Sequence, residues 1–188
     1  MEAIAEATIQ VLLAVGLNRL TTTRVADRAG VSVGTLYQYY PNKPALLYAV
    51  LEAHSIRVVE AVEHACRANR GAAVKVLMAA VVEAFVKAKR ERTDISTALY
   101  AAAAEPEGAA VLRRLSKRVH RVLTAALADA AGPTAGDMEF VALMLYSAMV
   151  GATPAVLEAG APPKMGIRLH QELLVLCQRY AVKSVGSS

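Results

Sequence analysis

Apolar residues recur every three to four positions along most of the chain, the spacing that an amphipathic α-helix gives to its buried face. Gly16, Gly30 and Pro41 stand where successive apolar stripes end. No segment alternates apolar and polar residues between turn signals, as a half-buried strand would. We therefore predict an all-α fold of about nine helices, at about residues 2–15, 21–29, 33–39, 43 to before Gly71, 72–91, 94–104, 107–130, 137–152 and 166–182.

The composition of these helices changes near residues 50 to 70. Short helices separated by turn residues precede this region, and longer, alanine-rich helices follow it. The change predicts a helix-turn-helix domain over residues 1–46, with its motif at about 21–40, and a helical body over residues 47–188. The fourth helix joins them without a flexible linker.

Residues 21–40 form two short helices around a glycine turn, the arrangement of a helix-turn-helix whose second helix enters the DNA major groove. Thr21 and Ser32 are placed to cap the two helices, and Gly30 permits a left-handed backbone in the turn. Leu36 and Tyr40 are expected to point inward. The side of the second helix that is left to face outward carries Val33, Gly34, Thr35, Gln38 and Tyr39.

These outward residues have chemistry that suits DNA. Gln38 can hydrogen-bond an adenine edge, and the methyl group of Val33 or Thr35 can touch a thymine methyl. Gly34 lets the DNA approach the helix backbone closely. Near the start of the motif's first helix, which Thr21 is placed to cap, hydroxyl groups and backbone N–H groups can hold a phosphate. The expected phosphate contacts are Thr22, Thr23, Tyr37, Tyr39 and Lys43.

The run from Leu20 to Leu47, LTTTRVADRAGVSVGTLYQYYPNKPALL, closely resembles the DNA-binding head of the tetracycline-repressor (TetR) family. With an upstream match at Ile4-Ala5-Glu6-Ala7, the resemblance covers about residues 2–55. It implies a homodimeric transcriptional regulator, most often a repressor, that binds a palindromic operator and is released by a small ligand. By position, Val33 and Gln38 occupy variable reading positions, and the family's backbone and base contacts match Thr22, Thr23, Ser32, Gly34, Thr35, Tyr37, Tyr39 and Lys43.

Two features differ from the family pattern. The chain begins almost directly at the first helix, so the basic arm that some members place in the minor groove is either missing or not included in this sequence. Pro44 stands where an acidic or polar residue is common, which alters the start of the fourth helix but leaves Lys43 in place.

The resemblance also implies that the body binds an effector and forms the dimer. The last two predicted helices are apolar over wide arcs, as expected of helices buried on two sides, and in the resembled family they form a four-helix dimer bundle. We favour this over a purely intramolecular core. The candidate interface residues are Val141, Leu145, Met149, Leu169, Leu173, Leu176 and Tyr180.

A ligand pocket has weaker support, because Met and aromatic residues at helical spacing also describe ordinary core. The candidate lining is Met78, Val82, Phe85, Leu99, Tyr100, Met144 and Tyr146. With no Trp and two Phe, the chain offers few stacking partners for a flat aromatic ligand. A small apolar or flexible effector is therefore expected.

The net charge of +5 and the pI of about 9.4 permit an anionic partner. Residues 1–45 nevertheless hold four basic and three acidic residues, a net of +1, so non-specific DNA affinity should be modest. The basic excess lies in two later clusters, at residues 87–92 and 113–121. We interpret both as solvated helix faces, with a second anion-binding site as the alternative.

Other classes of protein lack support in the sequence. Cys66 and Cys177 have no metal-ligand spacing, and neither a metal nor a cofactor is expected. Residues 140–157 carry no charge and approach the length of a membrane span, yet Gly151 and Pro154 among small residues favour a buried helix. Acidic residues near the N-terminus argue against an export signal. We expect a cytoplasmic protein without a membrane partner.

Two further alternatives remain. An enzyme would need a nucleophile with its base, a carboxylate pair or a phosphate-binding loop, and none is recognisable. An interaction protein that no longer binds DNA would have a disrupted reading helix, whereas Thr35, Leu36, Tyr37 and Lys43 are intact. The sequence thus favours a non-enzymatic, DNA-binding regulator whose partners are an inverted-repeat duplex, a second copy of the chain and an unidentified effector.

Overall fold

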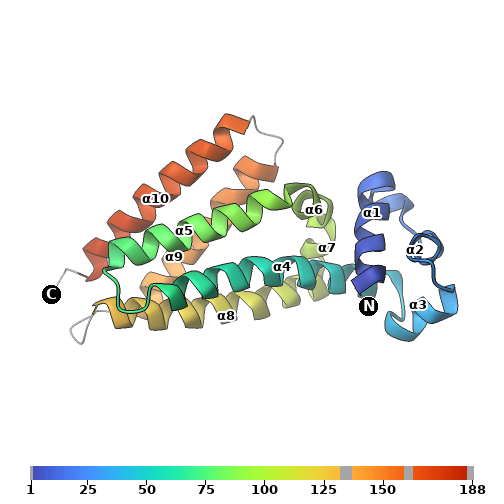
Figure 1. The fold of residues 1–188 in the computed structure, drawn as a ribbon, viewed down its shortest axis with the longest axis horizontal. Helices are drawn as coiled ribbons and strands as arrows, with labels where there is room; N and C mark the ends of the chain where they lie inside the picture. Colours follow the sequence, from blue (N-terminus) through green and yellow to red (C-terminus); the bar gives the residue numbers. More distant parts are fainter. Residues whose placement is uncertain (1, 132–136, 159–162, 186–188) are drawn as a thin grey trace. The chain divides into compact units, whose positions relative to one another are not determined.

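The computed structural model describes residues 2–131, 137–158 and 163–185, and every secondary-structure element within these ranges is helical (Figure 1). The elements are α1 (Glu2–Arg19), α2 (Thr22–Ala29), α3 (Val33–Tyr39), α4 (Lys43–Ala68), α5 (Val74–Glu91), α6 (Thr93–Ala98), α7 (Tyr100–Ala104), α8 (Pro106–Ala131), α9 (Met138–Thr153), the π-helical η1 (Pro154–Glu158) and α10 (Pro163–Val185). The predicted all-α fold is confirmed.

Two helices differ from their predictions. The first was expected to end at Gly16, and its regular helix does break there (φ 76°, ψ 167°), but a short helical segment follows the kink and reaches Arg19. The single helix predicted at 94–104 is divided into α6 and α7, with Leu99 between them. Leu99, where the helix breaks, is 1% exposed. The sequence of residues 94–104 contains no proline or glycine that would predict this break.

The chain divides into two compact units. The head unit comprises Met1–Ile56 and Asp94–Arg114. Its core collects buried side chains from α1 to α4, and α6 and the residue after it add to the same core. Examples are Leu12, Val25, Leu36, Leu46, Val50, Ile95 and Leu99. A segment distant in sequence therefore completes the core on which the helix-turn-helix rests.

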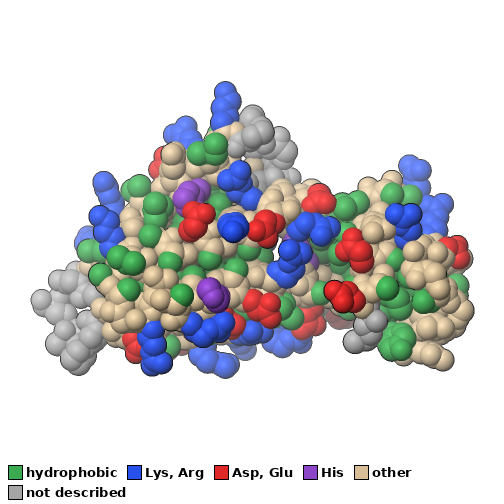
Figure 2. All heavy atoms as spheres, viewed as in Figure 1, with side chains coloured by type: hydrophobic (Ala, Val, Ile, Leu, Met, Phe, Trp, Pro, Cys, Tyr) green, Lys and Arg blue, Asp and Glu red, His purple; other side chains and the backbone are tan. Residues whose placement is uncertain are grey.

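The body unit comprises Arg57–Thr93 and Leu115–Ser188. In this unit α10 packs against both α5 and α9. The largest fully buried side chains there include Leu77, Met78, Phe85, Leu123, Leu127 and Leu145. Lys and Arg side chains gather along the edge of the body where α8 lies (Figure 2).

One apolar stretch, Met138–Val156, is long and apolar enough by length and composition to cross a membrane. Core helices of water-soluble proteins pass the same test. In this stretch Val141, Leu145 and Met149 are buried by the body's own helices, whereas 28% of the apolar window as a whole is buried.

Candidate nucleic-acid interface

Helix α2 begins with the predicted cap. Thr21 has an extended backbone (φ −128°, ψ 152°), and its side chain accepts a hydrogen bond from the backbone N–H of Arg24 at 3.3 Å. No acidic residue lies in the first turn, so the positive end of the helix dipole is not neutralised there. Val25 and Ala26 are fully buried and fix α2 on the head core. The start of α2 is therefore suited to an anion.

The turn after α2 needs a glycine. Gly30 has φ 69° and ψ 30°, a left-handed conformation that residues with a side chain rarely adopt. Its N–H donates to the carbonyl of Asp27 at 3.3 Å, and the N–H of Val31 donates to the carbonyl of Ala26 at 3.0 Å. These bonds close the end of α2 and direct the chain into α3.

Helix α3 presents its polar side outward. Ser32 caps it by accepting a hydrogen bond from the N–H of Thr35 at 3.0 Å, and Leu36 anchors it with 0% exposure. On the outer side Tyr37 and Tyr39 are 46% and 53% exposed. Gly34 and Gln38 are also exposed, while Val33, Thr35 and Tyr40 are half-buried. The structure thus places the residues expected to read bases on one short, accessible helix.

A hydroxyl pair joins the two helices of the motif. The oxygens of Thr22 and Tyr37 lie 3.1 Å apart, although 15 positions separate the residues. Because one hydroxyl donates to the other, one O–H remains free to donate to an anion. Thr23, beside Thr22, is exposed. The pair could not be read from the sequence, but each member was already a predicted phosphate contact.

Lys43 has a partner that the sequence did not reveal. Its Nζ donates to the carbonyl of Leu17 at 2.8 Å, linking the start of α4 to the last turns of α1. An ammonium group has three donors, so two remain for another acceptor. Lys43 thus joins α4 to α1 and is also a candidate phosphate contact.

Two arginines on α2 were also outside the predicted site. Arg28 donates from Nε to the side-chain oxygen of Gln10 on α1 at 2.6 Å. Arg24 donates to the carbonyl of Arg19 at 3.4 Å. Both arginines line an open hollow between α1 and α2 together with Asp27. The internal bonds orient these cations, and the nearby carboxylate of Asp27 offsets part of their charge.

The predicted ligand-pocket residues do not share one environment. Met78, Val82 and Phe85 are buried within the body unit, and Leu99 is buried in the head unit. Tyr146 is half-buried and lies 3.4 Å from the Ser116 hydroxyl, whereas Met144 is 44% exposed. The side chain of Tyr100 lies outside the described residues. Within the described ranges, no group of three His, Cys, Asp or Glu residues is placed to hold a metal ion.

The predicted dimer residues fall on both sides of their helices. Five of them are already buried within this chain, namely Val141, Leu145, Met149, Leu169 and Leu173. Leu176 is 50% exposed and Tyr180 is half-buried. The outer side of α9 carries a separate apolar stripe of Phe140, Leu143, Met144 and Val150, and α10 exposes Val175, Leu176 and Val182.

Comparisons with known proteins bear on both parts of the chain. The model for bacterial regulatory proteins of the tetR family matches residues 4–50, and the model for the tetracyclin repressor-like C-terminal domain matches residues 74–180. The tetracycline repressor protein class C of Escherichia coli is 44% identical over 52 residues, which cover 28% of this chain and 24% of that protein. The nucleoid occlusion factor SlmA of Pasteurella multocida is 42% identical over 53 residues, 26% of this chain and 27% of SlmA.

The chain therefore matches about a quarter of the length of these curated relatives. Similarity in structure extends much further. The transcriptional regulator FadR of Bacillus subtilis, solved in complex with stearoyl-CoA, superimposes with a TM-score of 0.68. The match covers 100% of this chain and 98% of FadR at 16% sequence identity, so it shows a shared fold.

Proposed function

The chain belongs to the tetR family of bacterial regulatory proteins, and we propose that it is a repressor that binds an inverted-repeat operator as a homodimer and is released by a small apolar effector. Members of the family are non-enzymatic, DNA-binding transcriptional regulators of the cytoplasm, and we assign this chain the same compartment. The observation that carries the proposal is α3, on which Leu36 is fully buried while Gly34, Gln38 and Tyr39 face outward.

Base reading is assigned to the middle of α3. Gln38 is exposed and has the donor and acceptor that pair with the N7 and N6 atoms of adenine. The half-buried Val33 and Thr35 offer methyl groups for thymine. At Gly34 an added Cβ would meet nothing of the protein closer than the Ser32 hydroxyl at 3.7 Å. The protein itself therefore does not require glycine here, which supports a role in close approach of the DNA.

Phosphate binding is assigned to the edges of the motif. The Thr22–Tyr37 hydroxyl pair and the exposed Thr23 surround the start of α2, where backbone N–H groups and the helix dipole favour an anion. Tyr39 and the two remaining donors of Lys43 extend this row. Such contacts fix the position of α3 on the duplex but carry no sequence information themselves.

Dimerisation is assigned to the uncovered sides of α9 and α10. Residues that are buried within one chain, such as Val141 and Leu145, cannot be covered by a second copy. The stripe of Phe140, Leu143 and Met144 is 44–54% exposed and has the spacing of one helix face. A twofold-symmetric contact through this stripe and Leu176 of α10 would remove these side chains from water. Two copies of α3 would then read two half-sites, which doubles the few base contacts of a short helix.

The effector is assigned to the apolar interior of the body. Met78, Val82 and Phe85 on α5 are fully buried, so a ligand that reaches them must be mostly apolar. The complex of FadR with stearoyl-CoA shows that a protein of this fold is able to hold a long acyl group. An effector releases DNA only if it binds one conformation of the dimer better than the other.

Selection of duplexes from a random pool by the whole 188-residue chain, at near-physiological salt, tests the proposal. We expect an inverted repeat to be enriched, and we expect Gln38→Ala to relax the preference at one position in each half-site with little loss elsewhere. Tyr39→Phe serves as the matched control, because it removes an edge hydroxyl from the same helix. Enrichment of nothing by a folded dimer, or equal losses at all positions for both variants, would contradict the proposal.

A further inference from the structure

A groove of about 290 Å³ runs between α4 and α8 within the body unit. It is lined by Cys66, Arg67, Arg70, Arg121, Val122, Ala125, Ala126 and Asp129. Two ion pairs tie the helices together at its ends. Glu63 pairs with Arg118 at one end, and Arg70 pairs with Asp129 at 2.9 Å at the other. The groove therefore lies between two helices that ion pairs join.

The floor of the groove is apolar. Cys66 and Ala126 are 3% and 8% exposed, and burial raises the pKa of the Cys66 thiol to about 11, so this side chain is neutral at pH 7. The alanines at 125 and 126 are too short to fill the space between the helices. Val122 completes a surface over which a hydrocarbon chain can pack.

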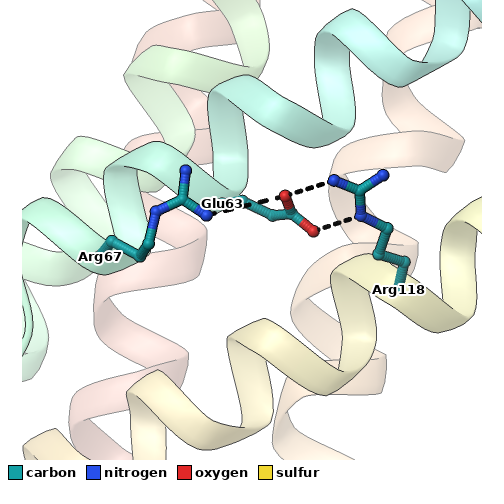
Figure 3. Close-up of polar contacts among 3 residues, drawn as sticks. All are labelled: Glu63, Arg67 and Arg118. Carbon is teal, nitrogen blue, oxygen red and sulfur yellow. Dashed lines mark hydrogen bonds and ion pairs between the residues drawn. The ribbon is translucent and has the colours of Figure 1, made fainter.

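The rim of the groove is cationic, and only part of its charge is paired. The carboxylate of Glu63 accepts bonds from Nε and Nη2 of Arg118 at 2.6 and 2.7 Å, and Arg67 approaches the same carboxylate at 3.8 Å (Figure 3). Glu63 is thus used mainly by Arg118, and the side chain of Arg67 stays 67% exposed. The pKa of Glu63 is lowered by its hydrogen bond to Arg118, so this carboxylate is charged at neutral pH.

Arg121 differs from the other arginines of the groove in its lack of a partner among the described residues. It is exposed at the groove, and within the described ranges its side chain makes no ion pair or hydrogen bond. The groove lining carries three arginines, at 67, 70 and 121, against one carboxylate, at 129, a net charge of +2. A planar guanidinium with five donors suits a carboxylate in a bidentate pair.

We propose that this groove binds a small amphipathic carboxylate, with its anionic group at Arg121 and Arg67 and its hydrocarbon chain on the apolar floor. A fully polar anion would leave the floor exposed to water, and a neutral apolar molecule would leave Arg121 without a partner. The modest volume, at the lower limit of known ligand sites, selects a short chain. The site lies on the surface between α4 and α8, and it does not depend on the assigned DNA and effector sites.

Titration of the whole chain with decanoate, followed by the NMR signals of Ala and Val methyl groups, tests the proposal without DNA. We expect saturable shifts at Val122, Ala125 and Ala126. Decanol, which has the same chain without the charge, should bind about tenfold more weakly. Arg121→Gln should weaken decanoate binding by a similar factor, since a charge-assisted hydrogen bond is lost.

Two further variants complete the design. Ala125→Glu places a carboxylate of the protein itself at the groove and should abolish binding, while its exposed position leaves the fold intact. Arg168→Gln is the matched control, because Arg168 is an exposed arginine on α10 outside the groove lining. The proposal fails if decanoate does not bind, if decanol binds as tightly, if Arg121→Gln has no effect, or if the shifts occur at the buried Val82 instead.

Discussion

The unit that carries the reading helix is the less basic of the two. The head unit has six basic and seven acidic residues, a net of −1, whereas the body unit has fifteen basic and nine acidic residues, a net of +6. A protein that relied on its overall field to bind DNA would have the opposite distribution. We therefore expect the DNA affinity of this chain to come from a few oriented groups on α2 and α3.

The contacts inside each unit show the same contrast. In the head, the cations Arg28 and Lys43 donate to the Gln10 side chain and to the Leu17 carbonyl, and these bonds hold α1 in place, while Lys43 keeps two donors for the phosphate contact assigned to it. In the body, the pairs Glu63–Arg118 and Arg70–Asp129 join α4 to α8, and many other basic residues stay exposed. Cations of the head hold its helices in position, whereas the excess positive charge of the chain lies in the body.

Tyr37→Ala should have the largest effect, although it changes no charge. It removes a hydroxyl from the Thr22–Tyr37 pair in both copies of a dimer, and hydrogen bonds to charged groups contribute about 1.5–3 kcal/mol each. We expect DNA affinity to fall at least about a hundredfold, for all sequences alike, in a fluorescence-anisotropy titration. Lys117→Gln, which removes a full charge from the body, should leave affinity nearly unchanged. A larger loss for Lys117→Gln would reverse the contrast between the units.

Gly108→Ala tests whether the segment after α6 belongs to the head. An added Cβ would lie 1.9 Å from the carbonyl oxygen of Ala102, so the backbone of α7 or α8 must shift. Overpacking of this kind costs about 3 kcal/mol, and thermal melting should show a clear drop in Tm. Gly34→Ala, whose Cβ meets only the Ser32 hydroxyl at 3.7 Å, is the control that should keep Tm.

Hydrogen exchange shows which unit the Gly108→Ala substitution destabilises. Amides of α1 to α3 should lose protection in Gly108→Ala, because Ile95, Leu99 and Ala102 complete the head core. If only amides of the body unit exchange faster, the assignment of residues 94–114 to the head is wrong.

Much of the reading motif was predictable because its signals are local. The caps at Thr21 and Ser32 and the left-handed Gly30 each depend on a few neighbouring residues, and all three are confirmed. The bonds of Lys43 to Leu17 and of His54 to Ser96 join residues 26 and 42 positions apart, and no local pattern reports such partners.

The body was less predictable for a related reason. A stripe of apolar residues shows that a helix is buried on some side, but it does not show which helix covers it. Residues of α9 that alternate around the helix, such as Leu145 and Met144, are equally apolar, yet one is 0% and the other 44% exposed. A stripe of apolar residues alone therefore does not divide a helix between internal core, ligand pocket and dimer face.

Glu63→Gln should weaken the body in a pH-dependent manner. The side chain of Glu63 is 8% exposed and holds Arg118 through two hydrogen bonds, so its replacement by a neutral amide should cost about 2 kcal/mol of unfolding free energy at pH 7. The bonds to Arg118 lower the pKa of the folded carboxyl below its ordinary value of 4.5. Its stabilisation is therefore complete above that value and is lost as the pH falls through the folded pKa.

Melting curves of the original protein and of Glu63→Gln, recorded from pH 7 down to pH 3, follow this loss. The Tm difference between them should be constant near neutrality and shrink in acid. Glu52→Gln is the matched control, since Glu52 pairs with Arg114 in the head unit and is 36% exposed, which makes its pair weaker. A Tm difference for Glu63→Gln that grows in acid would contradict this role of the carboxylate.

The smallest expected effect concerns salt, and it tests the charge contrast directly. The helix-turn-helix region has four cations, Arg19, Arg24, Arg28 and Lys43, so a dimer offers at most eight to phosphates. The slope of log K for DNA binding against the logarithm of the salt concentration should then be no steeper than about −7, from about −0.9 per phosphate contact. Removing two exposed body charges with Lys87→Gln and Arg90→Gln should leave that slope unchanged, because we assign no phosphate contact to the body. A slope steeper than this limit, or one that the double variant flattens, would mean that the basic body also touches DNA and that the two units share the work of binding.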